Sequence, residues 1–286
     1  MSQLVGMPDI VQKIRDNNTE LTNLEPEYNI LGKFGFEFAC ALKMNTTLTT
    51  LNLSKNPGFV GKVGGVAVAD ALEKNTTLMT LNLRYNGLGE VGGVAVAGAL
   101  ERNTTLTTLD LGVNGLGEVG SVAVVGALER NTTLMTLNLQ ANGLGEVGGV
   151  AVAGVLEKNT SLTRLDLGLS RLGEDGGVAV AGALERNTTL TSLDLGYNEL
   201  GDVGGIAIAN SLEKNTTLTT LKLEYNELGE GFGAAIAGAL EKNTTLTKMY
   251  IDKNISNYSE IQDILAKREP PVEGPLVKVA MPSLPR

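Results

Sequence analysis

Residues 78–88 read Leu-Met-Thr-Leu-Asn-Leu-Arg-Tyr-Asn-Gly-Leu and fit the pattern L-x-x-L-x-L-x-x-N-x-L. The leucine that opens this stretch returns every 28 residues, at Leu78, Leu106, Leu134, Leu162, Leu190, Leu218 and Leu246. A fixed period of this size is the sequence signature of a solenoid, in which each unit stacks only on its neighbours. The period therefore predicts the fold, and it leaves function to the positions that do not repeat.

Each unit contains the pattern of a strand followed by the pattern of a helix. The alternating leucines predict a short strand whose leucines face the core, and residues 92–102 predict a helix with Val96, Ala99 and Leu100 on its inner side. Asn86 and its equivalents are expected to stack as a ladder that satisfies buried backbone groups. The sequence thus predicts an α/β class fold, a right-handed horseshoe solenoid with parallel strands on its concave face and helices on its convex face.

The repeat also predicts the organisation of the chain. We expect an N-terminal capping helix within residues 1–17 and a solenoid of nine repeats over residues 18–256, atypical at both ends as capping requires. A C-terminal capping helix is expected over residues 257–268. The proline-rich residues 269–286 form either a disordered linker or an extended segment on the last repeat.

The unit of strand, asparagine, Leu-Gly turn and full helix resembles the ribonuclease-inhibitor type of leucine-rich repeat over residues 18–256. The phrase Leu-Glu-Lys-Asn-Thr-Thr-Leu at residues 72–78 is also similar to the repeats of tropomodulin-like actin-capping proteins. The resemblance implies protein binding through the concave strand surface. Inhibitors, GTPase activators, innate sensors and bacterial leucine-rich repeat effectors all belong to this class, and fold alone does not choose among them.

Composition and charge narrow the classes of partner. The net charge of −9 argues against a nucleic-acid surface, which needs clustered lysines and arginines, and favours a protein partner with a basic surface. No apolar run is long enough for a transmembrane helix and no signal peptide is visible, so we expect no membrane association and a cytoplasmic location, which for a secreted effector is a host cell's. The Asn-x-Thr/Ser sequons recur in every repeat, as at Asn75, and are interpreted as loop chemistry rather than glycosylation sites.

The sequence offers little catalytic chemistry. Histidine is absent, which removes the usual general base and the common triads, and we expect no catalytic residue, cofactor or metal. The G-x-G-x-x-G at Gly87, Gly89 and Gly92 recurs along the array, so we interpret it as turn and helix-packing chemistry. The single cysteine, Cys40, is interpreted as a small buried hydrophobe.

Candidate partner-binding residues lie where the repeats differ. Two positions of the pattern vary most: the one before the ladder asparagine, where tyrosines flank a small apolar centre, and an outward strand position that makes an acidic band. Tyrosine combines large area, low entropy cost and a polar tip, which is the profile of an interface anchor. The candidates are Tyr85, Asp110, Val113, Asn138, Arg164, Asp166, Leu169, Arg171, Asp194, Tyr197, Tyr225 and Tyr250. Of these, Asp166 and Asp194 are expected side by side, on an open surface that does not suit a glycosidase.

Two further features depart from a simple scaffold. Ser170 replaces a ladder asparagine, which we attribute to drift with a partner contact as the alternative. Val91 and Val94 recur in every repeat at positions that helical geometry turns outward. We expect neighbouring helices to cover these valines, which leaves a monomer; the alternative is weak self-association through the convex face.

The sequence therefore predicts a non-enzymatic protein–protein interaction module, an inhibitor, adaptor or effector that binds a partner on its concave surface. The alternatives are a tropomodulin-like actin-capping protein and, less favoured, a GTPase-activating protein.

Overall fold

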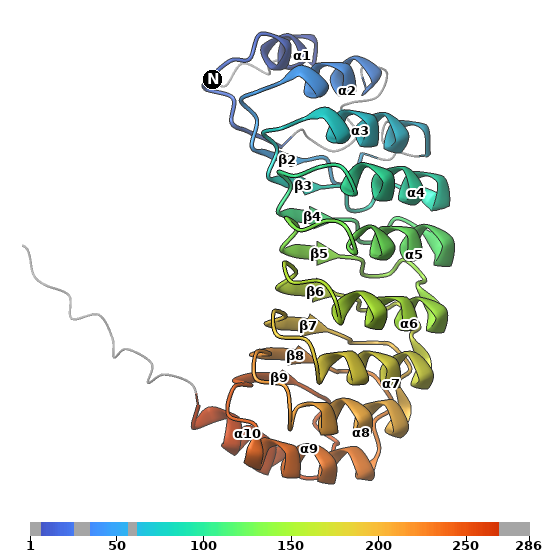
Figure 1. The fold of residues 1–286 in the computed structure, drawn as a ribbon, viewed down its shortest axis with the longest axis vertical. Coiled ribbons are helices and arrows are strands. Elements are labelled where there is room, and N and C mark those ends of the chain that lie inside the picture. The colour runs from blue at the N-terminus through green and yellow to red at the C-terminus, as the bar shows by residue number, and fades with distance from the viewer. Residues whose placement is uncertain (1–6, 26–34, 57–61, 269–286) are drawn as a thin grey trace, which may run out of the picture.

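The computed structural model describes residues 7–25, 35–56 and 62–268, and within these ranges it is one continuous stack of strand–helix units (Figure 1). Its strands form one parallel sheet in chain order: β1 (Asn23–Leu24), β2 (Thr50–Asn52), β3 (Thr80–Asn82), β4 (Thr108–Asp110), β5 (Thr136–Asn138), β6 (Arg164–Asp166), β7 (Ser192–Asp194), β8 (Thr220–Lys222) and β9 (Lys248–Tyr250). The helices are α1 (Met7–Arg15), α2 (Gly35–Met44), α3 (Lys62–Lys74), α4 (Gly89–Leu100), α5 (Gly117–Ala127), α6 (Gly145–Leu156), α7 (Gly173–Leu184), α8 (Gly201–Ser211), α9 (Glu230–Lys242) and α10 (Tyr258–Ala266).

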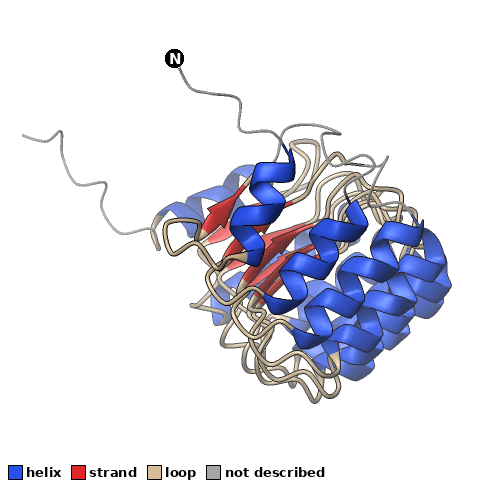
Figure 2. Cartoon of the chain, turned by 90° about the horizontal axis from the view of Figure 1, so that it is seen from above, coloured by secondary structure: helices blue, strands red, loops and turns tan. Residues whose placement is uncertain are grey.

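The strands and helices form two layers, as Figure 2 shows in a view from above the stack. Each strand pairs with the next at the same position of the repeat, as Leu81 pairs with Leu109, so equivalent residues stand in rows. The stack bends toward the strand side (Figure 1), which makes the strand surface the inner, concave one. The predicted α/β solenoid is confirmed. Helices α1 and α10 lie at its two ends, the predicted domain boundaries stay predictions, and the tail at 269–286 lies outside the described residues.

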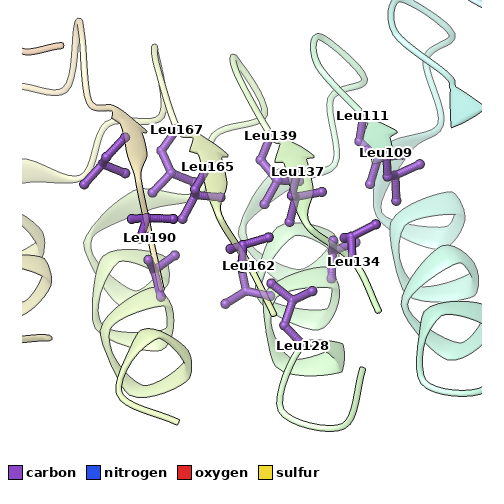
Figure 3. Packing of buried hydrophobic residues seen from close by; sticks show 14 of the residues in the cluster. Leu109, Leu111, Leu128, Leu134, Leu137, Leu139, Leu162, Leu165, Leu167 and Leu190 are labelled. Atoms are coloured by element: carbon purple, nitrogen blue, oxygen red, sulfur yellow. The ribbon is translucent and has the colours of Figure 1, made fainter. Parts of the chain in front are cut away.

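The core is a column of leucines between the two layers. Leu134, Leu137 and Leu139 of one repeat contact their equivalents in the next repeat, and each is at most 1% exposed (Figure 3). The inner helix residues Val96, Ala99 and Leu100 are buried against this column, as predicted. Each fully buried aliphatic side chain contributes about 1.5–3 kcal/mol. Because every repeat exposes its leucines until a neighbour covers them, the stack is stable only as a whole.

An asparagine ladder supports the turn after each strand, as predicted. The side-chain nitrogen of Asn114 donates to the carbonyls of Leu83 and Leu111 at 2.9 and 2.7 Å, one in the preceding repeat and one in its own. Its side-chain oxygen accepts the backbone N–H of Asn86 at 2.9 Å. Such a strand is only three residues long, so buried amides must replace the hydrogen bonds that a longer strand would make.

The ladder changes character at Ser170. The Ser170 N–H still donates to the side chain of Asn198 at 3.0 Å, but its hydroxyl reaches only the carbonyl of Gly168, at 3.5 Å. Serine has no amide group to accept the N–H of Asn142 in the preceding repeat, the bond that Asn142 itself provides for Asn114. The ladder therefore loses one rung between the fifth and sixth strands.

A second asparagine ladder runs along the opposite end of the strands, and the sequence analysis did not recognise it. Asn103 donates through its side-chain nitrogen to the carbonyl of Leu72, at the end of the preceding helix, at 2.8 Å. Its side-chain oxygen accepts the N–H groups of Thr105 and Leu106 at 3.0 and 2.8 Å. The same arrangement recurs at Asn45, Asn75, Asn131, Asn159, Asn187, Asn215 and Asn243. These are the sequon asparagines, and the nitrogen that glycosylation would modify is buried and hydrogen-bonded in the fold.

Two expectations about the helices are wrong. Cys40 is exposed, because the buried face of α2 carries Phe38, Ala39, Ala41 and Leu42 and turns the residue between them outward. Val91 and Val94 are also exposed, because neighbouring helices approach each other through glycines lower on their sides rather than leaning over these valines. The convex side consequently keeps an apolar outer surface.

Glycines decide how closely the helices pack. A Cβ at Gly149 of α6 would lie 2.6 Å from the Cα of Gly176 in α7, closer than real atoms approach. One turn further along the same helix, a Cβ at Gly154 would meet nothing within 4 Å. The first glycine is required by packing, and the second is not.

We predict opposite effects for the two alanine substitutions. Gly149→Ala should lower the free energy of unfolding by about 1–3 kcal/mol, because the helices must separate. Gly154→Ala should raise it by about 0.5–1 kcal/mol through helix propensity alone. Urea unfolding followed by circular dichroism measures both. Equal effects of the two substitutions would contradict the assignment of Gly149 to close packing.

We predict that Ser170→Asn stabilises the chain by about 1 kcal/mol, because it restores a rung of hydrogen bonds in a site that already has this geometry in other repeats. The matched control, Asn142→Ser, should destabilise by a similar amount or more. The same denaturation experiment measures both. Partner affinity should not change with Ser170→Asn, and a large loss of affinity would instead place this turn in the interface.

Candidate functional site

The candidate residues before the ladder asparagines lie in a turn rather than in the strands. Each strand ends three residues before this position, so the assignment of this row to outward strand positions is wrong. The position has a left-handed backbone in seven successive repeats, with φ between 55° and 58°. We call it the turn row: Lys55, Tyr85, Val113, Ala141, Leu169, Tyr197 and Tyr225.

The turn row holds large side chains where glycine would be expected. A left-handed backbone costs a residue with a side chain about 1–2 kcal/mol, and a β-branched valine is an outlier there. The N–H of each residue is tied to the next repeat, as in the 3.1 Å bond from Tyr85 to the carbonyl of Gly112. The scaffold thus holds these side chains away from the core, along the rim of the strand surface.

Tyr197 and Tyr225 form the most developed part of this row. Their rings stack with centroids 4.2 Å apart and planes inclined by 16°. They remain 47% and 60% exposed, so the pair is a preformed aromatic surface rather than core. Stacking restricts both side chains before any partner arrives, which lowers the entropy cost of binding.

Two hollows adjoin this tyrosine pair. The larger, about 520 Å³, has an apolar floor from Ala141, Leu169 and the two rings, with Arg171 and Glu199 at its rim. The smaller, about 280 Å³, lies on the strand side over Gly168 and Gly196. Its polar lining consists of Gln140, Asp194, Lys222 and Glu224. The pair therefore separates an apolar hollow from a charged one.

The acidic band lies beside these hollows, in sheet register. Asp166 of β6 pairs with Asp194 of β7, as predicted, and each accepts the N–H of the residue two positions on at 3.0 Å. Lys222 of β8 forms a 2.7 Å salt bridge with Asp194. With Asn138 and Arg164 these residues line a third hollow of about 200 Å³. Within the described residues Asp166 has no salt bridge.

Burial changes the proton affinity of this band. It raises the pKa of the Asp166 carboxyl, and the neighbouring Asp194 adds to the effect, against the opposing N–H of Gly168. Burial likewise raises the pKa of Asp110. The hydrogen bond from Lys222 to Asp194 raises the pKa of the lysine. The band is thus a partly desolvated group of carboxylates in which only one is neutralised by a lysine.

The remaining candidates lie in other groups. Arg84 extends over Gly112 to hydrogen-bond Gln140, and its guanidinium lies 5.1 Å from the ring centre of Tyr85. A Cβ at Gly112 would lie 2.3 Å from the arginine, so this glycine leaves room for the crossing. Tyr85 is therefore held apart from the Tyr197–Tyr225 pair, in the part of the row that contains Val113. Tyr250, near the end of the stack, lines a separate hollow with residues of α10.

The sequence analysis missed several residues of the site. It did not select the floor and rim residues Ala141 and Glu199, nor Lys222 and Glu224 in the charged hollow. The 28-residue register contained the signal for Ala141, because it places residues 141, 169, 197 and 225 in one row. The ion pair and the ring stacking depend on side-chain conformations, which no spacing predicts.

A family profile described as Leucine Rich repeat matches residues 45–69, 74–97, 102–125, 130–153, 158–181, 186–209 and 214–231, more than half of the chain. The chain belongs to the leucine-rich repeat family. Leucine-rich repeats generally act as non-enzymatic scaffolds for protein–protein interaction, and the repeats imply this role here. No curated protein sequence matches this leucine-rich repeat protein significantly.

Solved structures with similar folds include three other leucine-rich repeat proteins. Leiomodin-1 actin-binding site 2 has a TM-score of 0.48 at 25% identity, over 52% of this chain and 88% of the other. The tropomodulin C-terminal domain of Caenorhabditis elegans has 0.47 at 13%, over 53% and 92%. The protein LegL7 from Legionella pneumophila has 0.47 at 20%, over 91% and 95%. These scores are too low to carry a partner or an activity over to this chain.

The described residues 7–25, 35–56 and 62–268 contain no helix long and apolar enough to cross a membrane. Over the same ranges, no cluster of three or more acidic or cysteine side chains is arranged to hold a metal ion.

We predict that Asp166→Asn stabilises this leucine-rich repeat protein at neutral pH. The folded state raises the pKa of Asp166, so the charged form is penalised on folding and stability falls as pH rises through the range of this carboxyl. Asparagine avoids that penalty and can accept the same backbone N–H, as Asn138 does at 2.8 Å. Thermal melts should show a gain at pH 7 that vanishes below about pH 4, where aspartate is protonated in both states.

Asp194→Asn is the matched control, one strand along the same row. It removes the salt bridge with Lys222, so it should not give the same gain at pH 7. A stabilisation by Asp166→Asn that persists unchanged at low pH would show that the carboxylate charge is not its cause.

Proposed function

We propose that this chain binds a partner protein at the Tyr197–Tyr225 pair and the hollows beside it, as an inhibitor, adaptor or effector that covers a functional surface of the partner. The observation that carries the proposal is the stacked, exposed tyrosine pair at left-handed positions between an apolar and a charged hollow. Backbone strain kept at surface side chains is typical of residues that function retains.

The geometry favours an apolar side chain of the partner as the anchor. The larger hollow has the volume of a small-molecule site, and its floor consists of Ala141, Leu169 and the two tyrosine rings. An aliphatic or aromatic side chain placed there would be desolvated on several sides. Buried anchors of this kind supply most of the binding energy in protein interfaces.

The charges favour a basic residue of the partner next to that anchor. Asp166 has a desolvated carboxylate without a salt bridge in the described part of the chain, and Glu224 lines the charged hollow. A lysine or arginine that entered between them would replace lost hydration with ion pairs. The net charge of −9 would also steer a basic partner toward this protein over longer distances.

We predict that the double substitution Tyr197→Ala/Tyr225→Ala weakens partner binding at least about 30-fold, the equivalent of one interface hot spot. The partner is first captured with the wild-type chain, and its dissociation constant is then measured by isothermal titration calorimetry. The left-handed turns remain in both variants, so circular dichroism melts should change little. Tyr85→Ala is the matched control, since it removes a tyrosine from the same row outside the hollows, and it should change affinity less than threefold.

Equal retention of the partner by the wild-type and double-substituted chains would move the interface away from the tyrosine pair. A partner lost equally with Tyr85→Ala and with the double substitution would instead make the whole turn row the interface.

Inhibition and adaptor function differ in what happens to the bound partner. An inhibitor abolishes the partner's own activity in stoichiometric complexes, whereas an adaptor leaves it intact. The actin-capping alternative stays a prediction, and filament-end growth in a pyrene-actin assay that is unaffected by this protein would remove it.

A further inference from the structure

The outer surface of the helix layer is apolar over several repeats. The outward valines of successive helices are exposed: Val91 and Val94 on α4, Val119 on α5, Val147 and Val150 on α6, Val178 on α7 and Val203 on α8. We call this surface the valine face. Figure 2 shows the helices side by side as one outer layer of the molecule. Single exposed valines are ordinary, but a row that continues over five helices is typical of an interface.

Small residues make the valine face flat. Gly98, Gly126 and Gly154 lie one turn beyond the central valines of their helices. A Cβ at Gly126 or Gly154 would meet no atom within 4 Å, so the helix backbone is open to contact there. Another helix could approach closely along these positions, as helices do where small residues line the contact.

Charged rows border the valine face on both sides. The row at the helix N-termini is acidic, with Glu90, Glu118, Glu146 and Glu174 exposed. The row at the helix C-termini consists of salt bridges between repeats, such as Arg130 with Glu101 at 3.2 Å. In these pairs the basic side chain is the more exposed one, 76% against 38% in this example. The outermost charges are therefore negative on one border and positive on the other.

We propose that a second copy of this chain covers the valine face. The face repeats with the period of the solenoid, and another array of helices with the same spacing is the surface that fits it repeat by repeat. A two-fold axis parallel to the long axis of the stack would make the facing helices antiparallel. It would place the acidic border of each copy against the basic border of the other, and it would oppose their helix dipoles.

The other face-to-face two-fold arrangement is disfavoured by the same charges. An axis parallel to the helices would place the acidic borders of the two copies against each other, and like charges across an interface are costly. An anionic lipid surface as occupant is disfavoured by the acidic border and by the net charge of −9.

The oligomeric state tests the proposal. Analytical ultracentrifugation of the full chain should give a mass that rises from 29.9 kDa toward twice that value as the concentration increases. Val150→Glu should keep the mass at 29.9 kDa, since it places a charge at the centre of the face. Val94→Glu is a second variant with the same expected result. Met135→Glu is the matched control, because Met135 is similarly exposed (48% against 57%) but precedes β5 in the strand layer, and it should dimerise like the wild type.

The single cysteine reports which way the copies face. Cys40 is exposed on α2, near one end of the stack, so a spin label there needs no further engineering. In the proposed dimer the two labels lie at the same end, and double electron–electron resonance should show a short, defined distance. Labels at opposite ends of the dimer would overturn the antiparallel-helix arrangement. A wild-type chain that stays monomeric, or a dimer that Val150→Glu and Val94→Glu both leave intact, would overturn the proposal itself.

Discussion

The hydrogen bonding of buried asparagine side chains is the interaction on which the rest of this molecule depends. Strands of three residues leave backbone groups unpaired at both ends, and burying those groups without partners would cost more than the leucine core could offset. One ladder, which includes Asn114, satisfies the turn after each strand. The other, which includes Asn103, joins the end of each helix to the start of the next strand. Because each amide also reaches into the neighbouring repeat, the same bonds that complete one unit attach it to the next.

This division of labour separates scaffold from surface. Leucines, ladder asparagines and close-packed glycines such as Gly149 are required by stacking, so they recur with the period. Two surfaces remain outside that requirement. The turn row is held by left-handed backbone at the rim of the strand layer, and the valine face lies on the outside of the helix layer. A protein with both could bind a partner on one side while a second copy covers the other, because the two surfaces lie on opposite layers.

Sequence reasoning succeeded where a residue's environment follows from its place in the period. It located the leucine core, the first ladder and the pairing of Asp166 with Asp194. It was wrong where three-dimensional packing decides. Cys40 is exposed because its helix buries Phe38 and Leu42 instead, and Val94 is exposed because glycines set the contact between neighbouring helices. It placed the tyrosines in strands, although the strands end earlier and the tyrosines lie in left-handed turns.

The sequence by itself determined the architecture and the rows of this leucine-rich repeat protein, because a 28-residue period allows only one way for equivalent residues to align. Only the tertiary structure decided which members of a row act together. Tyr197 stacks on Tyr225, while Tyr85 of the same row is held by Arg84. Lys222 neutralises Asp194 and leaves Asp166 without a salt bridge among the described residues. These differences arise from side-chain conformations and local burial, which vary between repeats whose backbones are equivalent.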